Sequence, residues 1–338
     1  MKRILFSFLF LYLLFIPVFA QTAVEYYRSG CSKYSLQDYT GSIQDFTKSI
    51  EINPQFSEAF HNRGLAKVKL RNCNGAIYDY NKAIQINPKY TEAYCNRGAA
   101  KEHLQDFNGA IIDFNNAIEI NPQFARAYNN RGNAKQDLQD YEGALEDFTK
   151  AIEINPQYAV AYNNRGLAKA SMKDYNGAIQ DYNKAIDLNP FDTNACINRG
   201  ASKEYLQDFN GAIIDFTKAI TINPQFARAY NYRGNSKQDL KDYEGAIQDF
   251  TKAITINPQY AVAYNNRGLV KESLKDYRGA IQDYNKSIEI NPQYADAYND
   301  RGVAKHLLGD KEGACFDWRK AVELGLINAY DFISEYCK

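Results

Sequence analysis

Apolar residues recur at helical spacing in two segments of every 34 residues from residue 23 onward. The segment 243–256 shows the pattern clearly, with apolar side chains at Tyr243, Ala246, Ile247, Phe250, Ala253 and Ile254. Spacings of three and four residues are typical of an amphipathic helix with one buried stripe. The segment 227–240 before it has the same character, so the two predict a helical hairpin.

The ends of these helices carry recognisable signals. Asp242 precedes the second helix of this hairpin and can cap its first turn. Asn257-Pro258 ends it, because the residue before proline avoids the α conformation and proline lacks an N–H. Glycine inside a helix costs about 1 kcal/mol in propensity. We therefore expect the recurring helix glycines to let helix backbones approach closely.

Proline and glycine repeat the same period along the chain. Outside the first twenty residues, the prolines are Pro54, Pro88, Pro122, Pro156, Pro190, Pro224, Pro258 and Pro292, each 34 residues after the last. Two glycine series with this period begin at Gly30 and Gly41. The period predicts, within residues 21–328, nine units: 23–56, 57–90, 91–124, 125–158, 159–192, 193–226, 227–260, 261–294 and 295–328. Residues 329–338 are expected to form a C-terminal capping helix, because the last unit must cover its apolar face.

The unit resembles the tetratricopeptide repeat (TPR) family. The residues that carry the resemblance in the seventh unit are Tyr230, Gly234, Ala246, Phe250, Ala253 and Pro258. The resemblance implies an all-α fold: a right-handed α-solenoid (superhelix) of stacked antiparallel helix-turn-helix repeats. It also implies a concave groove lined by the first helix of each unit, which binds an extended peptide or a partner protein.

Charged residues occupy two positions that are apolar in the family. In the third unit these are Arg97 and Lys101, and the second helix carries Asp113; the same triplet recurs along the chain. We expect each Asp to lie between the Arg of its own unit and the Arg of the following unit, in a partly buried ladder. The alternative is a set of solvated charge stripes, each contributing little to stability.

The N-terminus has the layout of a secretory signal peptide. Lys2 and Arg3 precede an apolar run, 4–16, and small residues stand before a cleavage point at Gln21. Residues 1–20 are therefore expected to direct export to the periplasm or the secreted space. Retention as an uncleaved membrane anchor is the alternative.

Composition argues against several classes of function. The 338 residues include 40 Lys and Arg against 40 Asp and Glu, so no basic excess favours nucleic acid. The chain has only three histidines, in different units, and no motif of a nucleophile, phosphate loop or metal site. We expect surface histidines, no cofactor, no metal and no enzymatic activity.

The six cysteines contain no C-x-x-C pair. Folding of the last hairpin about residue 326 would bring Cys315 and Cys337 together, which predicts a disulfide; two free thiols are the alternative. Cys73 and Cys196 replace recurring aromatic residues and are interpreted as small core residues.

Family positions that face the groove give a candidate peptide site. The candidate residues are Arg126, Asn129, Asn130, Asn133, Gln136, Asn163, Asn164, Arg228, Asn231, Asn235, Gln238, Asn265 and Asn266, with Asp137 and Asp239 beside them. Asparagine donates and accepts hydrogen bonds, which suits a peptide backbone, and arginine suits a carboxylate. The lysines of the family's carboxylate clamp are absent.

Three alternatives stay open for this surface. Units three to five resemble units six to eight at a spacing of 102 residues, so the doubled Arg/Asn pattern can reflect duplication alone. The surface can also bind a carbohydrate or envelope polymer. Finally, the chain can be a docking or regulatory subunit for an enzyme on another chain.

Overall fold

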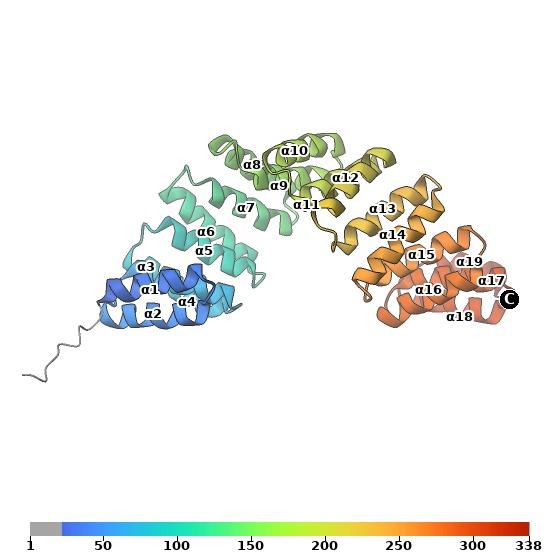
Figure 1. Cartoon of the computed structure of the whole chain (residues 1–338), viewed down its shortest axis with the longest axis horizontal. Helices are drawn as coiled ribbons and strands as arrows, with labels where there is room; N and C mark the ends of the chain where they lie inside the picture. The colour runs from blue at the N-terminus through green and yellow to red at the C-terminus, as the bar shows by residue number, and fades with distance from the viewer. Residues whose placement is uncertain (1–21, 338) are drawn as a thin grey trace, which may run out of the picture. The chain divides into compact units, whose positions relative to one another are not determined.

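The computed structural model describes residues 22–337, and the predicted signal segment 1–20 lies outside this range. Within it, the secondary structure consists of nineteen α-helices and contains no strand. Contacts divide the chain into two compact units, each made of several 34-residue repeats: an N-terminal unit, 1–156, and a C-terminal unit, 157–338. In each of them consecutive helices pair as antiparallel hairpins (Figure 1). The expected all-α class and the stacking of hairpins are confirmed. The right-handed sense of the superhelix stays a prediction.

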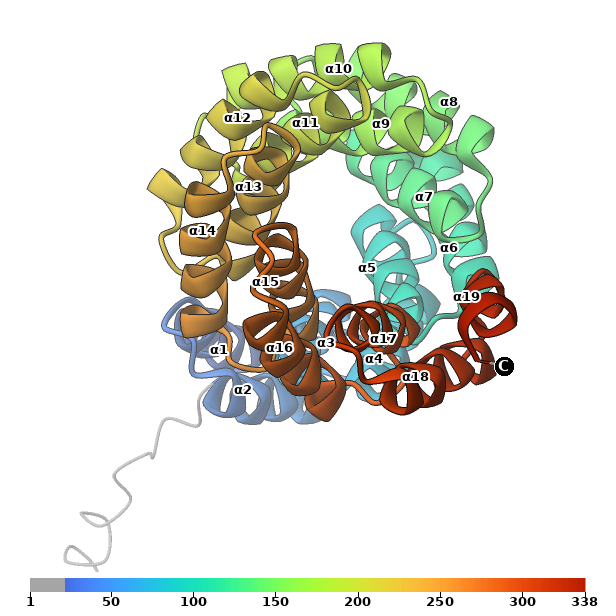
Figure 2. The same cartoon turned by 90° about the vertical axis from the view of Figure 1, so that its right-hand side faces the viewer.

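Nine first helices alternate with nine second helices. The first helices are α1 (Ala23–Ser35), α3 (Ser57–Lys69), α5 (Thr91–Glu102), α7 (Ala125–Asp137), α9 (Ala159–Ser171), α11 (Thr193–Tyr205), α13 (Ala227–Asp239), α15 (Ala261–Ser273) and α17 (Ala295–Leu307). The second helices are α2 (Tyr39–Ile52), α4 (Cys73–Ile86), α6 (Phe107–Ile120), α8 (Tyr141–Ile154), α10 (Tyr175–Leu188), α12 (Phe209–Ile222), α14 (Tyr243–Ile256), α16 (Tyr277–Ile290) and α18 (Lys311–Glu323). A short last helix, α19 (Ala329–Tyr336), follows. In the C-terminal unit, the helices α11, α13, α15 and α17 lie on the inner side of the row and α10, α12, α14 and α16 on the outer side (Figure 2).

Helix ends follow the sequence signals. The side chain of Asp242 accepts a hydrogen bond from the backbone N–H of Gly245, 3.0 Å away, at the start of α14. A Cβ atom on Gly245 would overlap the Asp242 carboxylate, so the second glycine series makes room for the capping side chain. At the other end, Asn257 has an extended conformation and its N–H still donates to the carbonyl of Ala253. None of the helices in 22–337 combines the length and apolar character that crossing a membrane requires.

The first glycine series leaves room for an aromatic ring of the partner helix. A Cβ on Gly98 of α5 would lie 2.7 Å from Cε1 of Phe114 of α6, whose ring is fully buried. The expectation that these glycines bring helix backbones together was therefore wrong in its detail: they bring the backbone of one helix against a ring of its partner. The second series does not serve backbone approach either, because its glycines lie beside the capping carboxylates.

The recurring charges form compact clusters within each hairpin. Nε of Arg97 lies 2.9 Å from Oδ2 of Asp113, and Nζ of Lys101 lies 2.8 Å from the same oxygen. Asp113 is fully buried, while the two cations keep part of their side chains in solvent. The contact to the neighbouring hairpin differs from the expected one, because Nη1 of Arg97 donates to Oδ1 of Asn81 on the preceding second helix. The link between repeats therefore runs from arginine to a neutral acceptor. From the second repeat to the ninth, each aspartate binds the two cations of its own repeat, whereas Asp45 of the first repeat binds Lys33 and the hydroxyl of Ser29.

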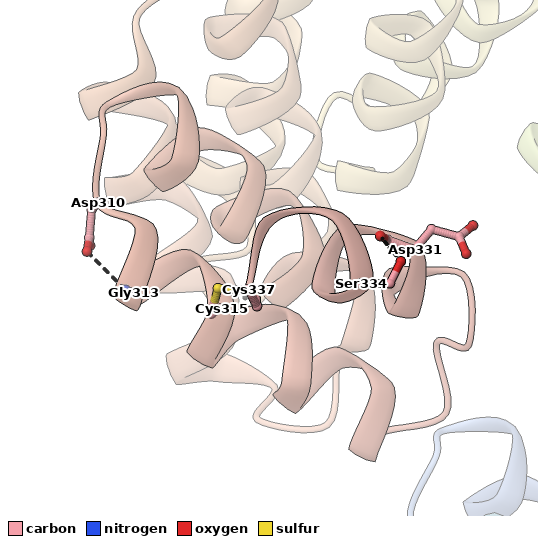
Figure 3. Close-up of a disulfide and its surroundings, with 6 residues drawn as sticks. All are labelled: Asp310, Gly313, Cys315, Asp331, Ser334 and Cys337. Atoms are coloured by element: carbon pink, nitrogen blue, oxygen red, sulfur yellow. Dashed lines mark hydrogen bonds between the residues drawn. A yellow bond between two sulfur atoms is a disulfide. The ribbon is translucent and has the colours of Figure 1, made fainter.

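The C-terminal helix closes the last hairpin. Cys315 of α18 and Cys337, directly after α19, form a disulfide (Figure 3). The ring of Phe332 stacks on Trp318 with 5.1 Å between centroids, and Ala329 is fully buried. The α19 helix therefore covers the apolar end of the C-terminal unit through both ring packing and a covalent bond.

Candidate functional site

The first helices present one exposed side chain at their second residue in each repeat. In the N-terminal unit, Arg126 of α7 occupies this place, and in the C-terminal unit Arg228 of α13 does. The guanidinium of Arg126 lies 5.2 Å from the ring centroid of Phe124 and that of Arg228 lies 5.7 Å from Tyr232. Each of the two units therefore carries one exposed arginine held against an aromatic ring.

Both arginines also make a polar contact. Nη2 of Arg126 donates to Oδ1 of Asn96 at 3.2 Å, and Nη2 of Arg228 donates to the hydroxyl of Tyr232 at 3.0 Å. The hydrogen bond that Arg228 donates to Tyr232 raises the pKa of Arg228. A guanidinium has five N–H donors, so these contacts leave donors that can bind a carboxylate.

Four of the predicted asparagines are buried. Asn129, Asn163, Asn231 and Asn265 have 3%, 9%, 3% and 2% of their surface exposed. Buried amides need hydrogen-bond partners inside the protein. These four side chains accordingly lie beneath the surface that a peptide would contact.

The half-buried asparagines connect neighbouring first helices. Nδ2 of Asn266 donates to Oδ1 of Asn231 at 3.1 Å and to Oδ1 of Asn235 at 3.0 Å. Nδ2 of Asn198 likewise donates to Oδ1 of Asn163 at 3.0 Å. Because each bond joins two successive repeats, the amides hold adjacent first helices in register.

The N-terminal unit has related contacts. Nδ2 of Asn130 lies 3.6 Å from Sγ of Cys95, which is a weak contact. Asn133 and Gln136 are half-buried on the same helix, and Oε1 of Gln136 has no hydrogen-bond partner among the described residues. Asn164 and Gln238 are also half-buried, on α9 and α13.

The acidic residues beside the predicted site are exposed. Asp137 and Asp239 stand at the ends of α7 and α13. Asp239 nevertheless loses part of its hydration to the surrounding protein, which raises the pKa of its carboxyl group.

Three partly buried glutamates on the first helices were not predicted from the sequence. They are Glu102 of α5, Glu204 of α11 and Glu272 of α15. Burial raises the pKa of Glu102 to about 7, with a further contribution from Asp137. Burial also raises the pKa of Glu204 to about 7. Their common signal is a place two residues before the recurring turn leucine (methionine in the fifth repeat), where the other repeats have Tyr, Val, Gln, Ala or His.

Two of these glutamates accept hydrogen bonds inside the protein. The hydroxyl of Ser236, in the repeat after Glu204, donates to Oε1 of Glu204. The hydroxyl of Tyr284, in the same repeat as Glu272, donates to Oε2 of Glu272 at 3.0 Å. The carboxyl group of Glu272 thus accepts from the second helix of its own repeat, and that of Glu204 accepts from the first helix of the following repeat.

The histidines do not all lie on the surface as expected. His61 is only 7% exposed, and its Nε2 lies 2.8 Å from Nδ2 of Asn96. Burial lowers its pKa, so the neutral ring can accept from that amide. His306 is half-buried against Trp318, and His103 is exposed. In the described part of the chain, no group of three His, Cys, Asp or Glu side chains is placed to hold a metal ion.

The two cysteines interpreted as core residues differ from each other. Cys196 is buried, whereas Cys73 at the start of α4 is only partly buried. The core interpretation therefore holds for Cys196 and was wrong for Cys73.

Family models for repeats match the chain almost throughout. The model described as "Tetratricopeptide repeat" matches five segments that make up half of the sequence: 91–124, 125–158, 159–192, 227–260 and 261–294. Other tetratricopeptide repeat models match 26–56, 193–226 and 283–316, and a model described as "TPR repeat" matches 72–104. No curated protein matches the sequence.

Two solved structures with TM-scores above 0.5 show the same fold. The chain aligns with the hetero-tetramer Cut9-Hcn1 of APC/C at a TM-score of 0.60 and 15% identity, covering 94% of this chain and 76% of that one. It aligns with a tetratricopeptide repeat protein from Parabacteroides merdae at a TM-score of 0.57 and 19% identity, covering 73% and 98%. MamA is 29% identical over 49% of this chain and 96% of its own, at a TM-score of 0.44.

These repeats indicate a protein–protein interaction scaffold, and none of the matching models describes an enzyme. The hairpin geometry, the ring-seating glycines and the repeat matches agree, and the chain belongs to the tetratricopeptide repeat family.

Proposed function

We propose that this chain is a non-catalytic scaffold of the cell envelope or secreted space that binds an extended peptide or a partner protein on its first helices. The observation that carries the proposal is the pair Arg126 and Arg228. Both side chains are exposed, both lie over a ring, and each stands on a first helix of its own unit. An arginine oriented by a ring and a hydrogen bond loses little freedom when it binds a carboxylate.

The amide network beneath this surface supports binding by a rigid face. Asn266, Asn231 and Asn235 hold neighbouring first helices through hydrogen bonds between repeats. A surface whose side chains are already ordered has a smaller entropic cost on association. The buried and half-buried asparagines thus support the binding surface, and the exposed arginines are the residues to test.

Export is part of the proposal and is supported by the sequence of residues 1–20. Cell fractionation followed by mass spectrometry of the mature N-terminus tests it. A chain that begins at Gln21 and is found outside the cytoplasm supports export, and a full-length cytoplasmic chain contradicts it.

A pull-down tests the binding function. The tagged chain is purified from the envelope fraction after crosslinking, next to an Arg126→Ala/Arg228→Ala variant. A matched control is Arg278→Ala/Arg319→Ala, which removes two exposed arginines from the second helices α16 and α18. We expect a protein that co-purifies with the chain and with the control and is lost from the first-helix variant.

Two results would count against the proposal. One is a partner retained equally by both double variants, because the first-helix arginines would then be irrelevant. The other is recovery of polysaccharide without protein, which would favour the carbohydrate-binding alternative.

A further inference from the structure

A recess of about 260 Å³ opens between α9 and α11 in the C-terminal unit. Its lining includes Ala170 of α9, Tyr182 of α10, and Asn198, Ser202 and Tyr205 of α11. All of these elements belong to the fifth and sixth repeats. Most of its lining comes from the first helices α9 and α11, the kind of helix on which the proposed function places the partner.

The floor of the recess carries a hydroxyl group without a partner. Tyr182 is fully buried, and its hydroxyl has no hydrogen-bond partner among the described residues. Burial raises the pKa of the Tyr182 hydroxyl, and the nearby Ser202 offsets only part of this effect. The hydroxyl groups of Tyr182 and Ser202 are not joined by a hydrogen bond of normal geometry. A buried hydroxyl left unbonded costs free energy, so this donor favours an acceptor that enters the recess.

The eighth repeat shows what fills the same place elsewhere in this chain. Tyr284 corresponds to Tyr182, and its hydroxyl donates to Oε2 of Glu272 at 3.0 Å. The residue in the fifth repeat that corresponds to Glu272 is Ala170, twelve residues before the tyrosine in both cases. The fifth repeat therefore keeps the donor and lacks the carboxyl group.

The sixth repeat supplies a second comparison. There, the hydroxyl of Ser236 in the following repeat donates to Oε1 of Glu204. Ser202 stands in the same relation to Ala170, 32 residues after it. The recess thus combines two hydroxyl groups, Tyr182 and Ser202, each of which corresponds to a donor that binds a glutamate in another repeat.

The exposed ring of Tyr205 forms a flat wall of the recess. Tyr205 is 70% exposed and stacks on Tyr175, with 4.6 Å between centroids and 5° between ring planes. The two methylene groups of a glutamate side chain can pack along such a ring while its carboxyl group reaches the floor. Nδ2 of Asn198, another lining residue, already donates to Asn163, which fixes this amide.

We propose that this recess binds a glutamate side chain of the partner, whose carboxyl group takes the place that Glu272 and Glu204 occupy in other repeats. The inference rests on the proposed function, because it names the chemistry that the first-helix surface selects in its partner. Within this unit it assigns Tyr182 and Ser202 as donors and Tyr205 as the wall.

Ligand-observed saturation-transfer NMR on the full mature chain tests the recess with three peptides of the form acetyl-Ala-X-Ala-amide, where X is Glu, Gln or Leu. We expect the Glu peptide to bind most tightly and the Leu peptide not to bind. Tyr182→Phe removes one hydrogen bond and keeps the ring, so binding of the Glu peptide should weaken about fivefold. The matched control Tyr284→Phe should leave binding unchanged, because Glu272 already fills that place.

Ala170→Glu gives an independent measurement. The new carboxyl group should occupy the recess, abolish binding of the Glu peptide and raise the urea midpoint of the C-terminal unit. Ala170→Leu should block the peptide without raising the midpoint. Equal binding of the Glu and Leu peptides, or undiminished binding to the Ala170→Glu variant, would overturn the inference.

The pull-down separates this inference from the proposed function. If the Ala170→Glu variant captures the same envelope partner as the unchanged chain, the scaffold function stands and the recess is not its selective site. If no partner is captured at all, the scaffold function fails, and the peptide series still decides whether the recess binds glutamate.

Discussion

Arg97 holds Asp113 in a two-point contact, with its Nε and Nη2 donating to the two carboxylate oxygens. Lys101, one helical turn along, contacts the same carboxylate. The aspartate is fully buried, so its negative charge depends on these two cations. The same arrangement recurs in the other hairpins, from Arg63 and Asp79 to Arg301 and Asp317.

Asp113→Asn should destabilise the N-terminal unit by about 3 kcal/mol, because removal of one member of a buried ion pair leaves the other charges uncompensated. The measurement is a urea titration followed by circular dichroism, together with hydrogen exchange of α5 and α6. Glu153→Gln is the control, since it breaks the exposed Lys150–Glu153 pair and should leave the midpoint unchanged. Equal midpoints for Asp113→Asn and the unchanged chain would contradict the structural role of the cluster.

Gly98→Ala should also destabilise, although alanine favours helix by about 1 kcal/mol. The new Cβ would meet the buried ring of Phe114, and overpacking of this kind costs about 1–3 kcal/mol. Thermal unfolding of Gly98→Ala and of Gly98→Ala/Phe114→Leu measures the effect. We expect the second substitution to restore part of the loss, and a Gly98→Ala protein more stable than the original would refute the close contact.

Stability should fall as pH rises from about 4.5 to about 7. Burial raises the pKa of Glu102 and Glu204 to about 7, above the usual value of 4.5. A carboxyl group with a raised folded pKa contributes stability that is fully present below its unfolded pKa and is lost as pH rises through the folded pKa. The negative charge of Asp137 raises the pKa of Glu102 further, and that of Asp239 acts on Glu204 in the same direction.

Urea midpoints at half-unit steps of pH test this dependence. The Glu102→Gln/Glu204→Gln variant should show a flatter profile and a higher midpoint than the original chain at pH 8. A variant whose profile parallels that of the original would show that these two groups do not titrate in this window.

Reduction of the Cys315–Cys337 bond should release α19. The bridge closes a loop of 22 residues, and such a cross-link contributes about 3 kcal/mol in the chain-entropy account. In hydrogen exchange, a Cys315→Ser/Cys337→Ser variant should lose protection in residues 329–336 and keep it in α9 to α16. Unchanged protection of α19 would show that the stacking of Phe332 on Trp318 is sufficient to hold it.

The sequence was sufficient to predict the hairpins because their signals are local. Asp242 and Asn257-Pro258 mark the two ends of α14 through cap chemistry and proline sterics, which need no knowledge of the tertiary structure. The period of 34 then placed the remaining hairpins. The pairing of Arg97 with Asp113 also followed from helix spacing.

The orientation of side chains within a repeat was harder to predict. Asn129 and Asn130 are adjacent, yet one is buried and the other half-buried, a difference that depends on how the surrounding helices pack. Likewise, no local sequence signal indicates that Ala170 lines a recess. Its meaning depends on a comparison with Glu272 in three dimensions, where the tyrosine hydroxyl has an acceptor.

Each of these arginines donates to a residue of the preceding second helix, and this makes the contacts between repeats interchangeable. Arg199 donates to Oδ1 of Asn183 at 2.7 Å, and Arg233 donates to Oγ1 of Thr217 at 3.0 Å. Excision of residues 193–226 would therefore present Arg233 with Asn183, an acceptor that another arginine already uses. A gene encoding such a chain can gain or lose a whole 34-residue segment without a new joint, which allows its length to change in evolution while its interior stays the same.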